Sequence, residues 1–114
     1  MTADGFRRIA LSLPGTSEAA HMAHPDFRVR GKVFATLGWP DDAWGMVKLT
    51  PEEQEVLVAA EPAVFVPVKG AWGRQGCTNV RLDAAVETTL RSALTKAWRR
   101  AAPKRLAATL EASA

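Results

Sequence analysis

The sequence predicts an α+β domain, built as a two-layer sandwich in which an antiparallel sheet carries helices on one face. Apolar residues recur at helical spacing near both ends of the chain and after residue 50, whereas other stretches alternate apolar and polar residues with a period of two. Short turns join the strand-like stretches, and short connections favour antiparallel pairing. The expected order of elements is therefore helix, strands, helix, strands, helix.

Length and composition predict one soluble domain. The 114 residues are 47% hydrophobic and 24% charged, which is ordinary for a globular protein with a single modest core. We expect one domain over residues 1–114, with a tail after about residue 103 that is loosely attached. No stretch approaches a membrane span and no signal peptide opens the chain, so we expect a cytoplasmic protein. The single cysteine, Cys77, excludes an internal disulfide.

The first element is expected to be a helix. Thr2 is a suitable N-cap, and Phe6, Ile9 and Leu13 recur at helical spacing. Pro14 and the glycine after it end the pattern. A short strand is expected at 18–22.

The central stretch, residues 25–37, predicts a β-hairpin. Apolar and polar residues alternate from Lys32 to Leu37, which is typical of a strand with two unlike faces. Gly31 supplies the positive φ that a tight turn requires.

Two registers are compatible with this hairpin. A three-residue loop pairs Phe27 with Val33 and Arg28 with Lys32. A two-residue turn instead pairs Phe27 with Phe34 and places Arg28 on the same face as Val33. Because the three-residue loop keeps the apolar sides together, it is the register that we favour.

The middle of the chain predicts a strand followed by a well-capped helix. Residues 44–49 alternate in the manner of a strand. Thr50 is the expected N-cap, Pro51 the first helical residue, and Glu53 closes a capping box. Pro62 ends this helix.

The last part of the chain predicts two strands and a long helix. Residues 64–68 have strand composition, but the prolines within and before them confine this strand to an edge. A glycine-rich loop at 70–76 precedes a strand at 77–82. Asp83 is the expected cap of the final helix, which Pro103 interrupts. The apolar stripe of this helix consists of Val86, Leu90, Ala93, Leu94 and Ala97, with Trp98 beside it.

Strand parity predicts a basic and aromatic sheet face. If the apolar strand residues face the helices, the opposite face receives three cations, two large aromatic residues and no carboxylate. Cations neutralise phosphates, and flat rings accept unpaired bases by stacking. The alternative is that the tail or a second subunit covers this face. Its members are Lys32, Phe34, Thr36, Trp44, Met46, Lys48, Asn79 and Arg81.

The loop at 70–76 offers a second candidate site. With Arg74, its backbone N–H groups can meet an anion, although it lacks the lysine and hydroxyl residue of a P-loop. The alternative is a glycine-rich hairpin loop with Trp72 packed under it for rigidity.

Metal binding and nucleophilic catalysis have little support. His21 and His24 form a His-x-x-His pattern before Asp26, but no spacing selects the further ligands that zinc or iron requires. Cys77 is expected to be a small buried residue because no base accompanies it. A turn and a capping box explain the acidic pairs, so we assign no metal, cofactor or catalytic residue.

Basic residues gather near the C-terminus. Six basic residues follow position 90, against the single acid Glu111. They can add phosphate contacts, or they can simply match the negative end of the helix dipole. They are Arg91, Lys96, Arg99, Arg100, Lys104 and Arg105.

Four segments carry motifs of a known family, and they are Leu13–Gly15, Pro25–Ala35, Trp44–Leu49 and Gly70–Gly73. They resemble the MmcQ/YjbR family, and the resemblance extends to about residue 105. It implies a compact α+β fold with an antiparallel sheet, similar to the secretion-chaperone-like fold. Families of this type are often labelled DNA-binding, and the resemblance implies no enzymatic activity, cofactor or catalytic residue. The positions that match the motifs are Arg28, Gly31, Lys32, Phe34, Trp44, Lys48 and Trp72.

Together these observations predict a small non-catalytic domain that binds nucleic acid, with DNA expected, at low sequence specificity. Lys32, Lys48 and Arg81 are expected to contact phosphates, so affinity should fall steeply with salt. Phe34 and Trp44 are expected to stack on bases or wedge between them. The full set of expected contact residues is Arg28, Lys32, Phe34, Trp44, Lys48, Trp72, Arg74 and Arg81.

Two alternatives use the same residues differently. In the first, the sheet face binds a protein or peptide, or forms a homodimer. In the second, a small ligand occupies a pocket near Trp72 and Arg74.

Overall fold

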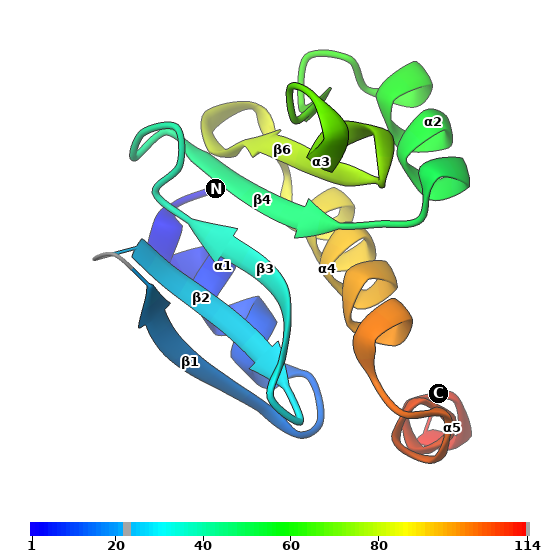
Figure 1. The fold of residues 1–114 in the computed structure, drawn as a ribbon. Coiled ribbons are helices and arrows are strands. Elements are labelled where there is room, and N and C mark those ends of the chain that lie inside the picture. The colour runs from blue at the N-terminus through cyan, green and yellow to red at the C-terminus, as the bar shows by residue number, and fades with distance from the viewer. Residues whose placement is uncertain (22–23, 114) are drawn as a thin grey trace.

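The computed structural model describes residues 1–21 and 24–113, and the side chains of 1–20 and 24–110. It confirms the α+β prediction, with a six-stranded antiparallel sheet in the order β1-β2-β3-β4-β6-β5 (Figure 1). The strands are β1 Thr16–His21, β2 His24–Val29, β3 Lys32–Leu37, β4 Trp44–Lys48, β5 Phe65–Pro67 and β6 Cys77–Arg81. The helices are α1 Ala3–Ser12, α2 Pro51–Ala60, α3 Ala71–Arg74, α4 Glu87–Ala101 and α5 Lys104–Ser113.

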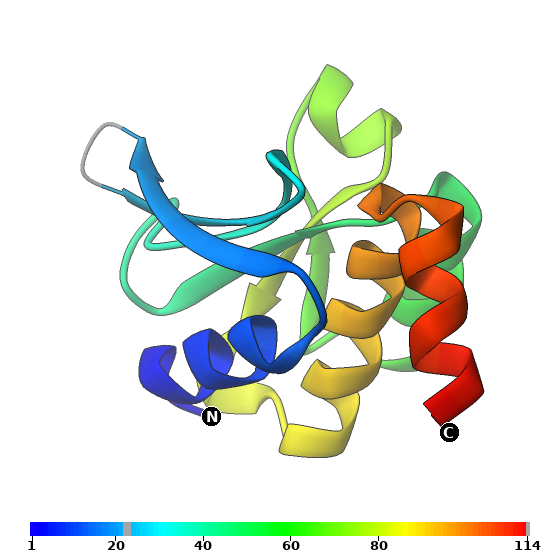
Figure 2. The same ribbon diagram turned by 90° about the horizontal axis from the view of Figure 1, so that it is seen from below.

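Helices α1 and α4 cover one face of the sheet and bury the main core against it (Figure 2). Phe6 of α1 and Leu94 of α4 are fully buried there, together with Val47 and Val80 of the sheet. Trp98 is also fully buried, and its indole Nε1 donates a hydrogen bond to the carbonyl of Pro14 at 2.8 Å. This bond ties α4 to the segment that follows α1. We call the other side of the sheet, which α1 and α4 leave uncovered, the open face.

The predicted caps of the first two helices are confirmed. The hydroxyl of Thr2 accepts from the N–H of Gly5 at 3.0 Å at the start of α1. In α2, the N–H of Glu53 donates to the Thr50 hydroxyl at 3.1 Å, and the N–H of Thr50 donates to the Glu53 carboxylate at 3.0 Å. The capping box that the sequence indicated is therefore complete.

The start of α4 differs from the prediction. Asp83 lies in a 3-10 turn, Leu82–Ala84, and its carboxylate accepts from Arg81 at 2.9 Å. The helix begins at Glu87 with Val86 as an N-cap that makes no side-chain hydrogen bond. Asp83 is therefore not the cap, because it pairs with the preceding strand instead.

The C-terminal tail is helical. Three residues of α5, namely Leu106, Ala107 and Leu110, pack against the core as partly buried apolar side chains. Their burial gives α5 an apolar attachment to the domain. Among the described residues, no helix is long and apolar enough to cross a membrane.

The central hairpin adopts the two-residue turn, so the favoured three-residue register is wrong. Val29 pairs with Lys32, and Arg28 pairs with Val33. The residues between them, Arg30 and Gly31, have φ angles of 50° and 83°. Positive φ at both central positions is what a type I′ hairpin turn requires, and its twist matches that of the strands.

A β-bulge then resets the register of the hairpin. The pairing shifts between Phe27 and Arg28, so that Phe27 lies opposite Ala35 instead of Phe34. An extra residue in one strand lets two neighbouring side chains turn to the same side. Phe34 and Ala35 are accordingly both fully buried, while Val33 faces the opposite way.

Two glycines with positive φ differ in their surroundings and allow a matched test. A Cβ at Gly76, where φ is 109°, would lie 1.9 Å from the carbonyl oxygen of Leu49. A Cβ at Gly31, where φ is 83°, would meet no atom within 4 Å.

We expect Gly31→Ala to lower the free energy of unfolding by about 1–2 kcal/mol through backbone strain alone. Gly76→Ala should cost about 3 kcal/mol or more, because strain and a backbone clash combine. Urea unfolding measures both, and equal losses would contradict this reading of Gly76.

Candidate binding pocket on the open face

One row of side chains crosses the open face from β2 to β5. Residues paired across antiparallel strands share a face. The register pairs Asp26 with Thr36, Thr36 with Met46, Met46 with Asn79, and Asn79 with Val66. The first four of these form the floor of a pocket.

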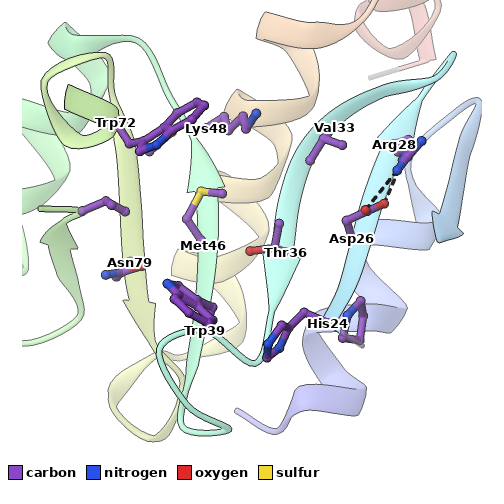
Figure 3. A pocket seen from close by; sticks show the side chains of 13 residues that line it. His24, Asp26, Arg28, Val33, Thr36, Trp39, Met46, Lys48, Trp72 and Asn79 are labelled. Carbon is purple, nitrogen blue, oxygen red and sulfur yellow. Dashed lines mark hydrogen bonds and ion pairs between the residues drawn. The ribbon is translucent and has the colours of Figure 1, made fainter. Parts of the chain in front are cut away.

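The pocket has a volume of about 640 Å³, which lies within the roughly 300–1,000 Å³ of small-molecule sites. Figure 3 shows Trp72 and Trp39 at its two ends, with Met46 between them. The side chains are mostly apolar or aromatic, with a few polar groups among them. Around the floor, the lining consists of His24, Pro25, Arg28, Val33, Trp39, Lys48, Val68, Trp72 and Cys77.

Two tryptophans at the rim are unusually exposed. Trp39 and Trp72 each retain 62% exposure. The ring of Trp39 meets the imidazole of His24 edge-on, with centroids 5.3 Å apart. The ammonium of Lys48 lies 5.7 Å from the ring centroid of Trp72. The open sides of both rings are therefore available to a ligand.

Trp72 is one of the expected contact residues, and the alternative placed it beneath a glycine-rich loop at 70–76. That segment contains the helix α3, and Trp72 projects from it over the pocket, so it is not packed beneath a loop. No sequence pattern gave Trp39 a role, and it lies in the connection between β3 and β4. A large aromatic residue among the polar residues of a short connection was the signal that could have identified it.

Asp26 neutralises Arg28 on the open face. The guanidinium of Arg28 donates to both carboxylate oxygens of Asp26, at 2.8 and 3.1 Å, and Asp26 retains only 4% exposure. This hydrogen bonding raises the pKa of Arg28. The expectation that this face carries no carboxylate is therefore wrong, because β2 contributes Asp26 to it.

Trp44 and Arg81 also lie on the open face but do not line the pocket. The guanidinium of Arg81 lies 5.7 Å from the ring centroid of Trp44 and donates to Asp83 at 2.9 Å. Both side chains thus have partners within the protein.

The structure separates Lys32 and Phe34 from the other predicted contact residues. Phe34 is fully buried in the core, so the expectation that it lies on the open face is wrong. Lys32 is paired with the core residue Val29 and shares the face of that residue. The bulge is the physical reason, because it moves Val33 to the open face in place of Phe34.

Arg28 and Lys48 are the lysine and arginine residues that line the pocket, and of these two Lys48 has no carboxylate partner. None of the ion pairs among the described residues includes it. Arg74 is exposed on α3, outside the pocket lining. The free positive charge within the pocket is consequently small.

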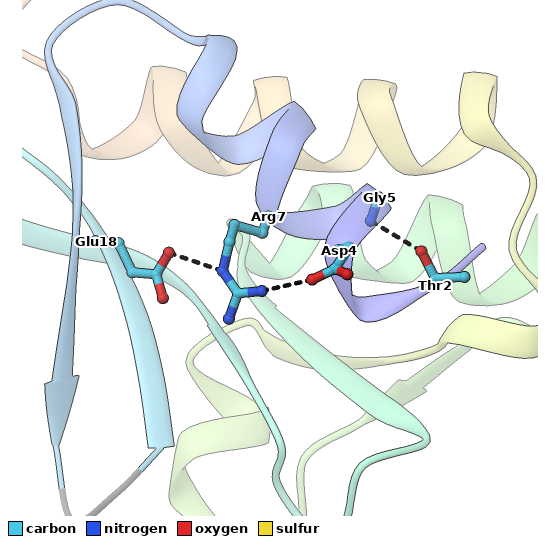
Figure 4. Close-up of polar contacts among 5 residues, drawn as sticks. All are labelled: Thr2, Asp4, Gly5, Arg7 and Glu18. Carbon is cyan, nitrogen blue, oxygen red and sulfur yellow. Dashed lines mark hydrogen bonds and ion pairs between the residues drawn. The ribbon is translucent and has the colours of Figure 1, made fainter.

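A further arginine is paired far from the pocket, on the first helix. The guanidinium of Arg7 donates to Glu18 of β1 and to Asp4, both at 2.8 Å (Figure 4). The hydrogen bond to Glu18 is the main cause of the raised pKa of Arg7. This pair links α1 to the edge strand β1.

The residues considered for metal binding do not assemble a site in the part of the chain that the structure describes. His24 and Asp26 both line the pocket, but the side chain of His21 lies outside the described residues. No group of three histidine, cysteine, aspartate or glutamate residues converges among those described.

Cys77 is buried at the pocket edge, as the sequence predicted, with 6% exposure. Burial raises the pKa of its thiol, and the positive charges of Lys48 and Arg100 oppose this shift only in part. Less thiolate is then present at neutral pH than for a free cysteine.

We therefore expect iodoacetamide to alkylate Cys77 severalfold more slowly in the folded protein at pH 8 than in the urea-unfolded chain. For the folded protein, the alkylation rate should still be rising at pH values where a free thiol is already ionised. The reason is that the raised pKa shifts formation of the Cys77 thiolate to higher pH. Mass spectrometry of quenched samples measures this. Equal rates for the folded and unfolded chain would contradict the description.

Comparison with known proteins gives a family and a fold. A family model described as YjbR matches residues 11–100. The crystal structure of Deinococcus radiodurans protein DR2400, whose family-model domain is DUF419, is similar with a TM-score of 0.72 at 21% sequence identity. The similarity covers 87% of this chain and 77% of that one, and at this identity it concerns the fold alone. No curated protein matches the sequence.

Proposed function

This chain belongs to the YjbR family, and we propose that it is a non-catalytic domain that binds single-stranded nucleic acid. One unstacked base would enter the pocket on the open face and lie against Trp39 or Trp72. The observation that carries this proposal is the pair of exposed indole rings at opposite ends of one concave, largely apolar site.

Exposed tryptophans favour a ligand with a flat face. Leaving a large ring in water forgoes the free energy that its burial would gain. A nucleobase covers such a ring by stacking, which contributes about 1–3 kcal/mol per base. Because every base has a π-face, stacking predicts low sequence specificity.

The charges favour a single strand over a duplex. Arg28 and Arg81 are paired with carboxylates, and Lys32 lies on the other face. Lys48 is then the main candidate for a phosphate contact, joined by the exposed Lys69 and Arg74 on either side of Trp72 in the chain. Few phosphates are contacted, so binding must rest on the rings. In a duplex the bases are stacked on one another, so they cannot stack on the tryptophan rings.

Replacing either rim tryptophan tests the proposal directly. We expect Trp39→Ala and Trp72→Ala each to weaken binding of a short single-stranded DNA by roughly 5- to 150-fold, which corresponds to the loss of one stacked base. Trp44→Ala is the matched control: it removes an indole from the same sheet face outside the pocket and should leave the affinity within about twofold. Fluorescence anisotropy of a labelled strand measures all three. Equal effects at all three positions would refute the assignment.

The salt dependence of the affinity distinguishes binding by base stacking from binding that rests on phosphate contacts. With one to three phosphates contacted, the slope of log K against log salt should lie between about −0.7 and −2. This is shallower than the sequence suggested, because two of the expected cations are paired. Titrating single-stranded and duplex DNA at several salt concentrations measures it. A steep slope with equal affinity for duplex would point to the basic C-terminal helices instead.

The alternative occupant of the open face is a second copy of the chain. The exposed apolar residues Trp39, Trp72 and Val66 favour this possibility, since Val66 retains 40% exposure beside the same row. Light scattering would then give a dimer, and acrylamide would fail to quench both rim tryptophans in it. A monomer with quenchable tryptophans supports the nucleic-acid proposal.

A further inference from the structure

Helix α3 carries Trp72 over the pocket, but no side chain of its own anchors it in the core. Of its four residues only Gly73 is buried, and glycine has no side chain. Trp72 itself retains 62% exposure. A helix of this length is not stable by itself, so contacts from other elements must hold α3 and its tryptophan in place.

The backbone of Gly73 packs directly against the segment that follows β5. A Cβ at Gly73 would collide with the carbonyl oxygen of Val68, so only glycine permits this close approach. The contact sets how near α3 comes to the sheet. A single backbone contact does not fix the direction in which the helix points, and a second attachment is therefore required.

The side-chain amide of Gln54 in α2 supplies this attachment. Its Nε2 donates to the carbonyl of Gly73 in α3 and to the carbonyl of Cys77 in β6, both at 3.0 Å. The hydroxyl oxygen of Thr78 also accepts from it, at 3.1 Å. The reversed amide orientation is excluded, because it would place an oxygen against two carbonyl oxygens that cannot donate. Gln54 therefore joins α2, α3 and β6 at one point (Figure 1).

The elements on either side of this amide are themselves well fixed. The capping box of Thr50 and Glu53 defines the first turn of α2, directly before Gln54. Thr78 is fully buried, and its hydroxyl donates to the carbonyl of Gly76 at 2.9 Å, which orients its oxygen to accept from Gln54. A change at Gln54 is therefore transmitted to α3, which buries no side chain of its own.

Resting on the proposed function, we infer that Gln54 is a positioning residue that holds the ring of Trp72 ready to stack on a base. A ring that is already held in place loses less conformational freedom when a base covers it. Without the amide, α3 and Trp72 would become ordered only on binding, which weakens the affinity. Gln54 does not line the pocket, so its effect on affinity must act through Trp72.

A double-mutant cycle tests this inference. We expect Gln54→Leu to weaken binding of a short single-stranded DNA roughly 3- to 10-fold, the effect of immobilising one side chain. In a chain that already carries Trp72→Ala, the same change should alter the affinity by less than about twofold. In a chain that carries Trp39→Ala, it should keep its full effect.

Gln75→Leu is the matched control, because it makes the same change at an exposed glutamine directly after α3. It should leave the affinity within about twofold. Gln54→Ala provides a second variant, with a residue that helices favour.

The indole N–H signals of the ¹⁵N-labelled free protein give a readout that a general loss of stability would not move. In Gln54→Leu the signal of Trp72 should shift, because its ring moves relative to the ammonium of Lys48, now 5.7 Å from its centroid. The signals of Trp39 and Trp98 should stay in place.

Equal losses of affinity with and without Trp72, or an unmoved Trp72 signal, would overturn the inference and leave the base pocket intact. Loss of folding in both Gln54 variants would also overturn it, since the amide would then serve the whole fold and not one ring. Failure of the unaltered protein to bind the strand would instead overturn the proposed function, and the inference with it.

Discussion

The β-bulge between Phe27 and Arg28 decides which side chains reach each face of this domain. In a regular hairpin, a shift of one residue exchanges the two faces of a strand. Here the bulge allows the adjacent residues Phe34 and Ala35 both to enter the core. Val33 and Arg28 remain on the open face, where they line the pocket. The chemistry of the open face thus depends on one local irregularity.

The consequence is a site that is aromatic rather than basic. Placing Phe34 in the core removes one ring from the open face, and pairing Lys32 with Val29 removes one cation from it. Asp26 and Asp83 balance two arginines. What remains is a largely apolar pocket with one lysine that has no carboxylate partner and two exposed indoles, which suits a flat uncharged group better than a row of phosphates.

Local signals allowed much of the fold to be predicted. The capping box of Thr50 and Glu53 and the N-cap of Thr2 involve residues close in sequence, and both formed as expected. The bulge could not be predicted, because it depends on how much apolar volume the core accepts from β3. The pairing of Asp26 with Arg28 could have been anticipated, because residues two apart on a strand share a face. The contact of Trp44 with Arg81 could not be predicted without knowing that β4 and β6 are neighbours in the sheet.

The helix dipole explains only some of the basic residues near the C-terminus. Arg99 and Arg100 occupy the last turn of α4, where positive charge interacts favourably with the helix dipole. Lys104 and Arg105 begin α5, where the dipole does not favour them. These helices are therefore the natural rival location for a nucleic acid.

Nuclear magnetic resonance of the ¹⁵N-labelled protein distinguishes the two locations most directly. On titration with a short single-stranded DNA, the account predicts that the indole N–H signals of Trp39 and Trp72 shift. The indole signal of Trp98, which is buried and bonded to Pro14, should stay in place. Shifts confined to the backbone signals of α4 and α5, with both rim indoles unchanged, would contradict the central claim.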